Sequence, residues 1–173
     1  TSQIQALMSM KDTLGAALKN PAQFARKIAR TRWKEASAKD PNEKNLARLQ
    51  SISLATQRHL ITKTAVDKAK ALRGQPVNEW PNRFAKNWDP KRDFAFAMLH
   101  AERLAKILVD TAICEILWEQ SREHPERVAV FERYIERALP RARYLHEQVL
   151  HTGQRLLSSL EEDVISEPQE MAS

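Results

Sequence analysis

Residues 40–74 read DPNEKNLARLQSISLATQRHLITKTAVDKAKALRG, and this stretch decides the fold class. Between Pro41 and Gly74 there is neither a proline nor a glycine to interrupt a helix. The large apolar residues recur near helical spacing, and they are Leu46, Leu49, Ile52, Leu60, Ile61, Val66 and Leu72. Asp40 or Asn42 can cap the start, and Gly74 can end the helix. The stretch therefore predicts one long helix over about residues 42–72.

Helical signals continue on both sides of this segment. The 173-residue chain is 42% hydrophobic but has only 3 glycines, and it lacks long β-type alternation. Apolar residues recur near helical spacing in four more segments, over residues 4–18, 21–38, 93–122 and 125–160. The sequence thus predicts an all-α bundle of about five long helices.

Two places in this plan are irregular. Residues 74–92 form the one extended connection, and their aromatic residues Trp80, Phe84 and Trp88 are spaced four apart. We expect these rings to bury against the helices, because large apolar rings are costly to leave in water. Pro140 lies inside the apolar pattern of the last helix, which predicts a kink there or two helices placed end to end.

Several kinds of chemistry have no motif in this chain. No apolar run approaches the roughly 18 residues that a membrane-spanning helix needs. Cys114 is the single cysteine, which excludes a disulfide framework and a thiolate metal site and fits a reducing compartment. The sequence contains no glycine-rich phosphate loop, no GxSxG and no HExxH.

The histidines and glutamates do not suggest an active site. No two histidines are separated by three or four residues, so no metal site is predicted, and we expect exposed or capping roles for His59, His100, His124, His146 and His151. Acidic residues of the later helices lie near arginines at helical spacing. We expect surface ion pairs, rather than catalytic roles, for Glu115, Glu119, Glu132 and Glu136.

Charge is distributed unevenly along the chain. Residues 1–73 carry a net charge of +10 and residues 74–173 carry −4. A basic half joined to a mildly acidic half suggests a surface for phosphates, for a lipid surface or for an acidic partner. The alternative is a solvated basic surface that binds nothing.

Residues 19–34, KNPAQFARKIARTRWK, are the sharpest local feature, with six basic residues and no acidic one. The cations expected to gather on one side of a helix are Arg26, Lys27, Arg30 and Lys34. The apolar residues expected on the opposite side are Pro21, Phe24, Ala25, Ile28 and Ala29, with Trp33 at the edge one turn after Ala29.

A basic amphipathic helix with an aromatic edge is suited to lie in a membrane interface, with its rings at the acyl boundary and its cations toward anionic headgroups. The alternative is that the apolar side packs on the bundle and the cations are simply solvated. Nucleic acid ranks last, because no aromatic–basic interleave and no helix-turn-helix spacing adds specificity.

The first residues, Thr1-Ser2-Gln3-Ile4-Gln5, resemble a known family. In FAD-dependent acyl-CoA dehydrogenases a Tyr-Glu-Gly-Thr-Ser-Gln-Ile-Gln segment lies near the end of the catalytic body. Residues 17–21, ALKNP, are similar to a stretch of the very-long-chain branch, which adds a helical C-terminal domain that begins with a basic, membrane-associating segment. Bacterial enzymes for short thio-substituted acyl-CoAs carry a helical C-terminal extension as well. Ala6 departs from the arginine often found there in medium-chain members.

The resemblance implies a chemistry that the chain completes only as part of a longer protein. Thr1 and Gln3 match positions that approach the FAD. The glutamate that removes the substrate α-proton would lie two positions before Thr1, so no catalytic residue is expected within these 173. The implied reaction couples that proton removal to hydride transfer from the β-carbon of a fatty acyl-CoA to the flavin. An electron-transfer flavoprotein then reoxidises the flavin.

The resemblance also implies an organisation. Four parts are expected: the last helix of the catalytic helical domain at 1–18, the basic amphipathic segment at 19–41, the C-terminal helical extension at 42–160 and an acidic tail at 161–173. The extension would support a homodimer, with the apolar stripes of 93–122 and 126–160 covering the catalytic body, unless those stripes form an internal core.

The implied location is the bacterial cytoplasm or the periphery of the inner membrane, or the mitochondrial matrix side in a eukaryote. The alternative function is a non-enzymatic basic helical module that binds a membrane surface or a protein partner.

Overall fold

Helices account for all the regular structure in the described part of the chain. The computed structural model describes residues 15–17, 19–73, 76, 79–80 and 95–159. Its helices are α2 (Pro21–Ser37), α3 (Pro41–Ala71), α6 (Ala95–Leu99), α7 (Ala101–Glu123) and α8 (Val128–His151), with the 3-10 turn η2 (Pro125–Arg127) between the last two. A short helical segment follows at 154–159. The predicted all-α bundle is confirmed, with four long helices among the described residues.

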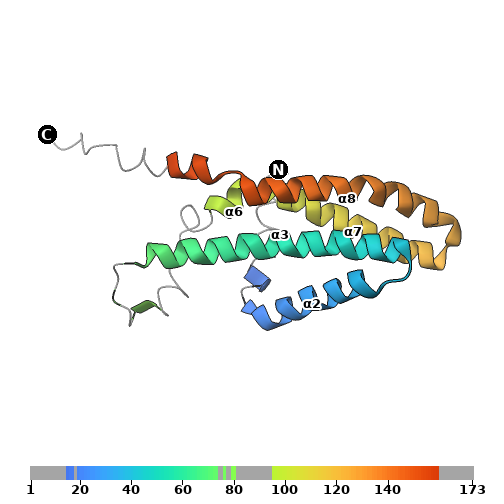
Figure 1. The fold of residues 1–173 in the computed structure, drawn as a ribbon, viewed down its shortest axis with the longest axis horizontal. Coiled ribbons are helices and arrows are strands. Elements are labelled where there is room, and N and C mark those ends of the chain that lie inside the picture. Colours follow the sequence, from blue (N-terminus) through green and yellow to red (C-terminus); the bar gives the residue numbers. More distant parts are fainter. Residues whose placement is uncertain (1–14, 18, 74–75, 77–78, 81–94, 160–173) are drawn as a thin grey trace.

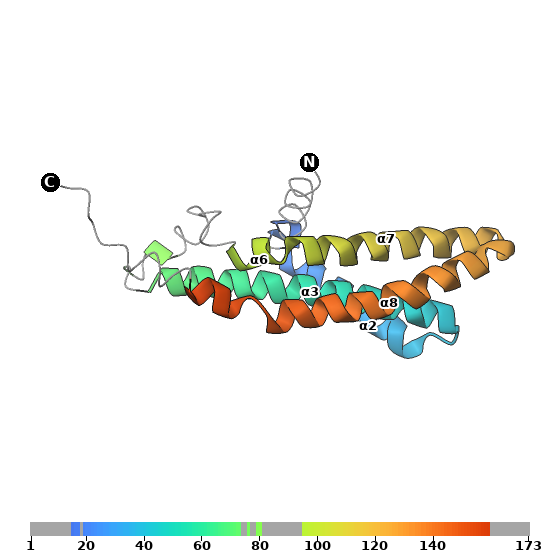
Figure 2. The same ribbon diagram turned by 90° about the horizontal axis from the view of Figure 1, so that it is seen from above.

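The long helices lie side by side and give an elongated bundle. α7 and α8 form an antiparallel pair that packs against α3 (Figures 1 and 2). α2 folds back along α3, and Figure 1 shows it on the side of α3 away from α8. α3 is therefore the central element, in contact with every other long helix.

The core is built from two apolar clusters along the bundle. The first joins the start of α3 to the middle of α7 and α8, with Leu49, Ile107 and Phe131 fully buried. Trp118 packs on Phe131, with 5.2 Å between ring centroids. The second lies toward the other end, where Leu60 and Leu104 are fully buried.

The apolar stripes of residues 93–122 and 126–160 therefore supply this internal core, and the expectation that they cover a catalytic body is wrong for their buried positions. Leu104 and Ile107 on α7, and Ile135 and Val149 on α8, are shielded within the bundle itself. The alternative of an internal core holds, because an antiparallel helix pair buries its facing stripes first.

Helix starts follow the sequence. The side chain of Asp40 accepts a hydrogen bond from the backbone N–H of Asn42 at 2.8 Å, so the predicted cap of α3 is Asp40. Asn20 caps α2 in the same way, accepting from Gln23 N–H at 3.2 Å, and Pro21 occupies the first helical turn. Gly74, the predicted end of α3, lies outside the described residues.

Two predicted helices are interrupted elsewhere than expected. The fourth has a turn at His100, which separates α6 from α7. α8 continues through Pro140 and breaks instead at Thr152–Gly153. Pro140 is exposed, so the Glu136 carbonyl that loses its helical donor is on the solvent side, and Figure 1 shows α8 bowed rather than broken.

Gly153 explains the break that does occur. Its φ is +91°, a left-handed conformation that side chains disfavour. A Cβ at this position would lie 2.6 Å from Leu99 Cδ2 and 3.0 Å from His100 Nε2. The segment that follows α8 can therefore pack against Leu99 and His100, at the turn before α7, only because residue 153 is glycine.

Other expectations fall partly or wholly outside the described residues. Trp80 is half-buried, as expected, whereas Phe84 and Trp88 belong to the part that is not described. The same holds for the acidic tail at 161–173 and for most of the predicted helix at 1–18.

Replacing Phe131 tests the first cluster. Phe131→Ala is expected to lower the free energy of unfolding by about 3–5 kcal/mol, because it removes a fully buried ring and leaves a cavity. The matched control is Val130→Ala at the adjacent position, where 53% of the side chain is exposed and the change should stay within about 0.5 kcal/mol. Urea unfolding monitored by circular dichroism measures both. Equal losses in the two variants would contradict this description of the core.

Candidate functional site

The α2 helix presents two apolar surfaces rather than one. Phe24 and Ile28 are half-buried against α3, and Thr31, on the same side, is only 7% exposed. Pro21, Ala25 and Ala29 were expected beside Phe24 and Ile28, with Trp33 at the edge, but these four residues face solvent. The sequence therefore placed five apolar residues on one side, whereas the structure divides them between the bundle and the water.

Trp33 is the most exposed large apolar side chain in the described chain, at 73%. It follows the exposed Ala29 by one turn, so a small apolar strip runs along the outside of α2. Trp33 is at the centre of this outer face rather than at the edge of a buried one. Its backbone carbonyl accepts a hydrogen bond from the Ser37 hydroxyl at 2.7 Å, which secures the last turn of the helix.

The predicted cations are brought together beside this strip. Arg26, Lys27, Arg30 and Lys34 are all exposed, and none of the four has an ion pair within the described residues. The only acid on α2 is Glu35, which is half-buried and lies 3.6 Å from Arg48 on α3. We call Trp33, Ala29 and the four cations the outer face of α2. It combines exposed apolar surface with unneutralised positive charge.

The flavin-binding expectation cannot be placed on this structure. Thr1 and Gln3, the residues expected to approach the FAD, lie outside the described residues. Among the described residues no group of three or more histidine, cysteine, aspartate or glutamate side chains could hold a metal ion.

Three histidines lie inside the bundle, contrary to the expectation of exposed or capping roles. His100 is fully buried at the turn between α6 and α7, and its ring packs on Phe96 with 4.6 Å between centroids. Its Nε2 donates to the Thr152 carbonyl at 3.2 Å, so its Nδ1 is the unprotonated nitrogen, 3.5 Å from the Arg103 guanidinium. This bond ties the end of α8 to the start of α7.

The other two, His59 and His146, are half-buried. The Nδ1 of His146 lies 2.8 Å from the Thr56 hydroxyl, whose own proton is donated to the Ile52 carbonyl. His146 therefore donates from Nδ1, and its Nε2 is the nitrogen that can accept a proton. Burial is the main cause that lowers the pKa of each of these rings, and the Lys63 and His146 charges lower that of His59 further. His124 and His151 are exposed as expected.

An ion pair between a buried aspartate and a half-exposed arginine fixes α7 to α8. Asp110 is 4% exposed, and it accepts from Arg141 Nε at 2.8 Å, from Arg141 Nη2 at 2.6 Å and from the Tyr134 hydroxyl at 3.0 Å. The hydrogen bond to Asp110 raises the pKa of Arg141, while burial and the same carboxylate raise that of Tyr134. The carboxylate accepts three hydrogen bonds, which suits a structural role rather than proton transfer.

The single thiol is equally inert. Cys114 is fully buried one turn from Asp110, and burial together with that carboxylate raises its pKa to about 12. A thiol of this pKa is not a thiolate at neutral pH, so it is neither a nucleophile nor a metal ligand there.

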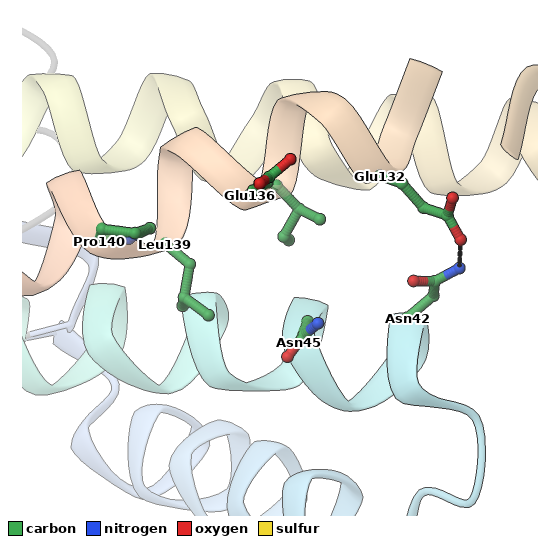
Figure 3. Close-up of a pocket in the computed structure, with 7 residues that line it drawn as sticks. Asn42, Asn45, Glu132, Glu136, Leu139 and Pro140 are labelled. Atoms are coloured by element: carbon green, nitrogen blue, oxygen red, sulfur yellow. Dashed lines mark hydrogen bonds between the residues drawn. The ribbon is translucent and has the colours of Figure 1, made fainter. Parts of the chain in front are cut away.

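A shallow groove of about 320 Å³ lies between the start of α3 and the first half of α8 (Figure 3). Asn42 donates to Glu132 across it at 2.8 Å, and Glu136, Leu139 and Pro140 line the rest. Of its two carboxylates, that of Glu132 is engaged by the Asn42 amide, which leaves the single carboxylate of Glu136 rather than an acid–base pair.

Surface ion pairs with arginines were expected for four glutamates of the later helices, Glu115, Glu119, Glu132 and Glu136. These ion pairs do not form in the described part of the chain. Glu132 and Glu115 instead accept from Asn42 and Gln50 on α3, at 2.8 and 2.7 Å. Glu119 and Glu136 are left without an ion pair there. Periodicity within one helix does not reveal this, because the partners come from a neighbouring helix.

None of the described helices is long and apolar enough to cross a membrane.

The buried histidines predict a loss of stability in mild acid. Because the folded-state pKa of His59, His100 and His146 lies below the ordinary value, the unfolded chain binds protons more readily. Their contribution is fully present above about pH 7.5 and is lost as the pH falls through about 6.5 toward the lowered folded values. Urea unfolding at pH 7.5 and 5.5 should show a lower midpoint at 5.5.

Substitution identifies the source of this pH dependence. His100→Gln and His146→Gln should each reduce the difference between the two pH values, whereas His124→Gln, at an exposed position, should leave it unchanged. A stability that is level from pH 7.5 to 5.5 in the unsubstituted protein would contradict the buried, neutral state of these rings.

Comparison with known proteins does not narrow the assignment. No protein-family model, no curated protein and no solved structure matches this chain. Function is therefore inferred from the surfaces described above and from the resemblance of residues 1–5 and 17–21 to the acyl-CoA dehydrogenases.

Proposed function

We propose that this chain is the C-terminal portion of an FAD-dependent acyl-CoA dehydrogenase, and that it docks the enzyme on an anionic membrane surface through the outer face of α2. The observation that carries the docking is the exposure of Trp33 beside four unpaired cations. Were the apolar residues of α2 all packed on α3, the cations would be a solvated surface and no more.

The outer face has the chemistry of an interfacial helix. Tryptophan prefers the headgroup level of a bilayer, where its ring is apolar and its N–H can remain hydrated. Each lysine or arginine near an anionic leaflet contributes about 1 kcal/mol. Arg26, Arg30 and Lys34 follow one another at successive turns, so a helix lying flat would present them all to the headgroups.

The catalytic part of the proposal rests on the sequence. The Thr1–Gln5 segment supports a parent protein that binds FAD through residues including Thr1 and Gln3 and oxidises a fatty acyl-CoA at its α,β-bond. The base that removes the α-proton would precede Thr1, and an electron-transfer flavoprotein would accept the electrons. The described bundle supplies none of these groups, so its proposed part is docking and assembly.

Assembly has its own support in the structure. Val109 and Ile116 are 56% and 54% exposed on α7, and the exposed Ala112 lies between them. These residues remain uncovered after the α3–α7–α8 core has formed. They are the apolar surface that we propose for contact with the rest of the enzyme and for the homodimer.

A second candidate function needs no flavin. The same outer face of α2 would serve a non-enzymatic helical module that binds a membrane surface or an acidic protein partner. Its support is the identical observation, Trp33 beside unpaired cations. The two candidates agree on lipid binding and differ on whether the intact protein is a flavoprotein.

Vesicle binding tests the docking. Arg26→Glu/Arg30→Glu/Lys34→Glu in the intact protein should weaken binding to phosphatidylglycerol vesicles by roughly 100-fold, because three contributions of about 1 kcal/mol are lost. The control is Arg122→Glu/Arg133→Glu/Arg137→Glu, which changes the charge equally at exposed, unpaired positions of α7 and α8. Trp33→Ala should weaken binding without a change of charge. Similar binding by both triple variants would contradict docking through α2.

Visible absorption tests the catalytic assignment. The intact protein isolated from its source should carry bound FAD and should lose its absorption near the flavin maximum when a fatty acyl-CoA is added without oxygen. A series of acyl chain lengths would then define the substrate. A colourless intact protein that still binds vesicles would exclude the dehydrogenase and leave the membrane or partner module.

A further inference from the structure

A second cationic site lies on a different flank of α2, where side chains of α2, α3 and α8 line one space. A cavity of about 500 Å³ lies there, open to solvent. Its polar lining residues are Arg32, Glu35, Arg48, Ser51, Arg143 and His146. We propose that this cavity, named here the arginine cavity, binds a small anion through its phosphate group. The proposal does not depend on flavin chemistry.

The charges of the arginine cavity call for an anion. Arg32, Arg48 and Arg143 come from three different helices and converge on one space, against a single carboxylate, that of Glu35. Glu35 lies 3.6 Å from Arg48, while Arg32 and Arg143 have no ion pair within the described chain. Arg32 and Arg143 are exposed, so water screens the repulsion among the three charges, and their guanidinium groups are accessible to an anion. Guanidinium groups match the paired oxygens of a phosphate.

A buried hydroxyl points to the same ligand. Ser51 lines the cavity, and its Oγ is buried without any hydrogen-bond partner. A buried hydroxyl left unsatisfied costs about 1–3 kcal/mol. Because the Oγ itself is covered, a phosphate oxygen in the cavity would accept its proton only after the Ser51 side chain rotates toward the cavity. Together with the arginines, Ser51 supplies the mixture of charged and neutral donors that phosphate sites commonly use.

His146 adds a donor that depends on pH. Its Nδ1–H is committed to Thr56, so a second proton would enter at Nε2 and make the ring a cation. The charged groups around the ring are Arg32 and Glu35 on α2, Arg48 and His59 on α3, and Arg143, Glu147 and His151 on its own helix or just beyond. A bound anion would favour the charged ring and raise its pKa. Anions should therefore bind more tightly in mild acid.

Calorimetric titration of the intact protein with inorganic pyrophosphate tests the arginine cavity. Pyrophosphate should bind with one site per chain, and Arg48→Gln/Arg143→Gln should weaken it at least ten-fold. Arg133→Gln/Arg137→Gln removes the same charge from exposed positions outside the cavity and should change the affinity by less than two-fold. Absence of binding, or equal weakening by both double variants, would overturn the proposal.

A single substitution keeps the binding test valid if the double variant does not fold. Arg143→Gln alone carries the test if the double variant is unstable, because Arg143 is exposed and makes no ion pair in the described chain.

The pH dependence is tested with sulfate. Sulfate is a dianion throughout the range from pH 5.5 to 7.5, so its own protonation cannot contribute. It should bind more tightly at pH 5.5, and His146→Gln should abolish the difference. Tighter binding in acid that survives His146→Gln would overturn the assigned role of this ring.

Binding to vesicles distinguishes a soluble phosphate ligand from a lipid headgroup. Arg48→Gln/Arg143→Gln should leave binding to phosphatidic acid vesicles unchanged if the ligand is soluble, and should weaken it if the ligand is a headgroup. Either result supports a phosphate site when pyrophosphate binding is also lost. The Arg26→Glu/Arg30→Glu/Lys34→Glu variant should retain pyrophosphate binding, so failure of the cavity and failure of membrane docking give different patterns.

Discussion

Burial of α3 on two sides is the constraint on which the rest of the structure depends. Leu49 and Leu60 contribute to the apolar clusters with α7 and α8, and α2 packs along another side. Several of its buried polar groups are satisfied within the helix, as Thr56 donates to Ile52 O and Gln57 to Ser53 Oγ, whereas the hydroxyls of Ser51 and Thr64 have no partner. A helix with polar groups satisfied in this way can be enclosed without a polar face being kept in water.

The pairing of α7 and α8 is fixed by polar contacts that an apolar seam alone would not supply. The bidentate Asp110–Arg141 pair sets their register in the middle, and the His100–Thr152 bond closes the end. Apolar side chains tolerate sliding by a turn, whereas a buried carboxylate must meet its guanidinium or become very costly. The same enclosure keeps His100 neutral, so one set of contacts determines both the helix register and the sensitivity to acid.

The way α2 rests on this frame determines both proposed anion sites. Because Phe24, Ile28 and Thr31 face α3, Trp33 and the cations Arg26 and Arg30 must face away from the bundle. Arg32 and Glu35 lie on the flank between the two, where Arg143 and His146 of α8 reach them. One helix thus offers a convex surface suited to lipid and an open cavity suited to a single phosphate, and the two differ in how many helices supply their cations.

The sequence by itself determined the helical class, the start of a helix at Pro21, a cap at Asp40 or Asn42, the break between residues 122 and 125 and the gathering of cations on residues 19–34, since all of these depend on neighbours within one or two turns. It did not determine the division of the apolar residues of α2, the burial of His100, or the continuation of α8 through Pro140 to Gly153. It also did not reveal the meeting of Arg32, Arg48 and Arg143. Only the tertiary structure decided these, because each depends on which face of one helix is covered by another, and residues far apart in the chain supply that cover.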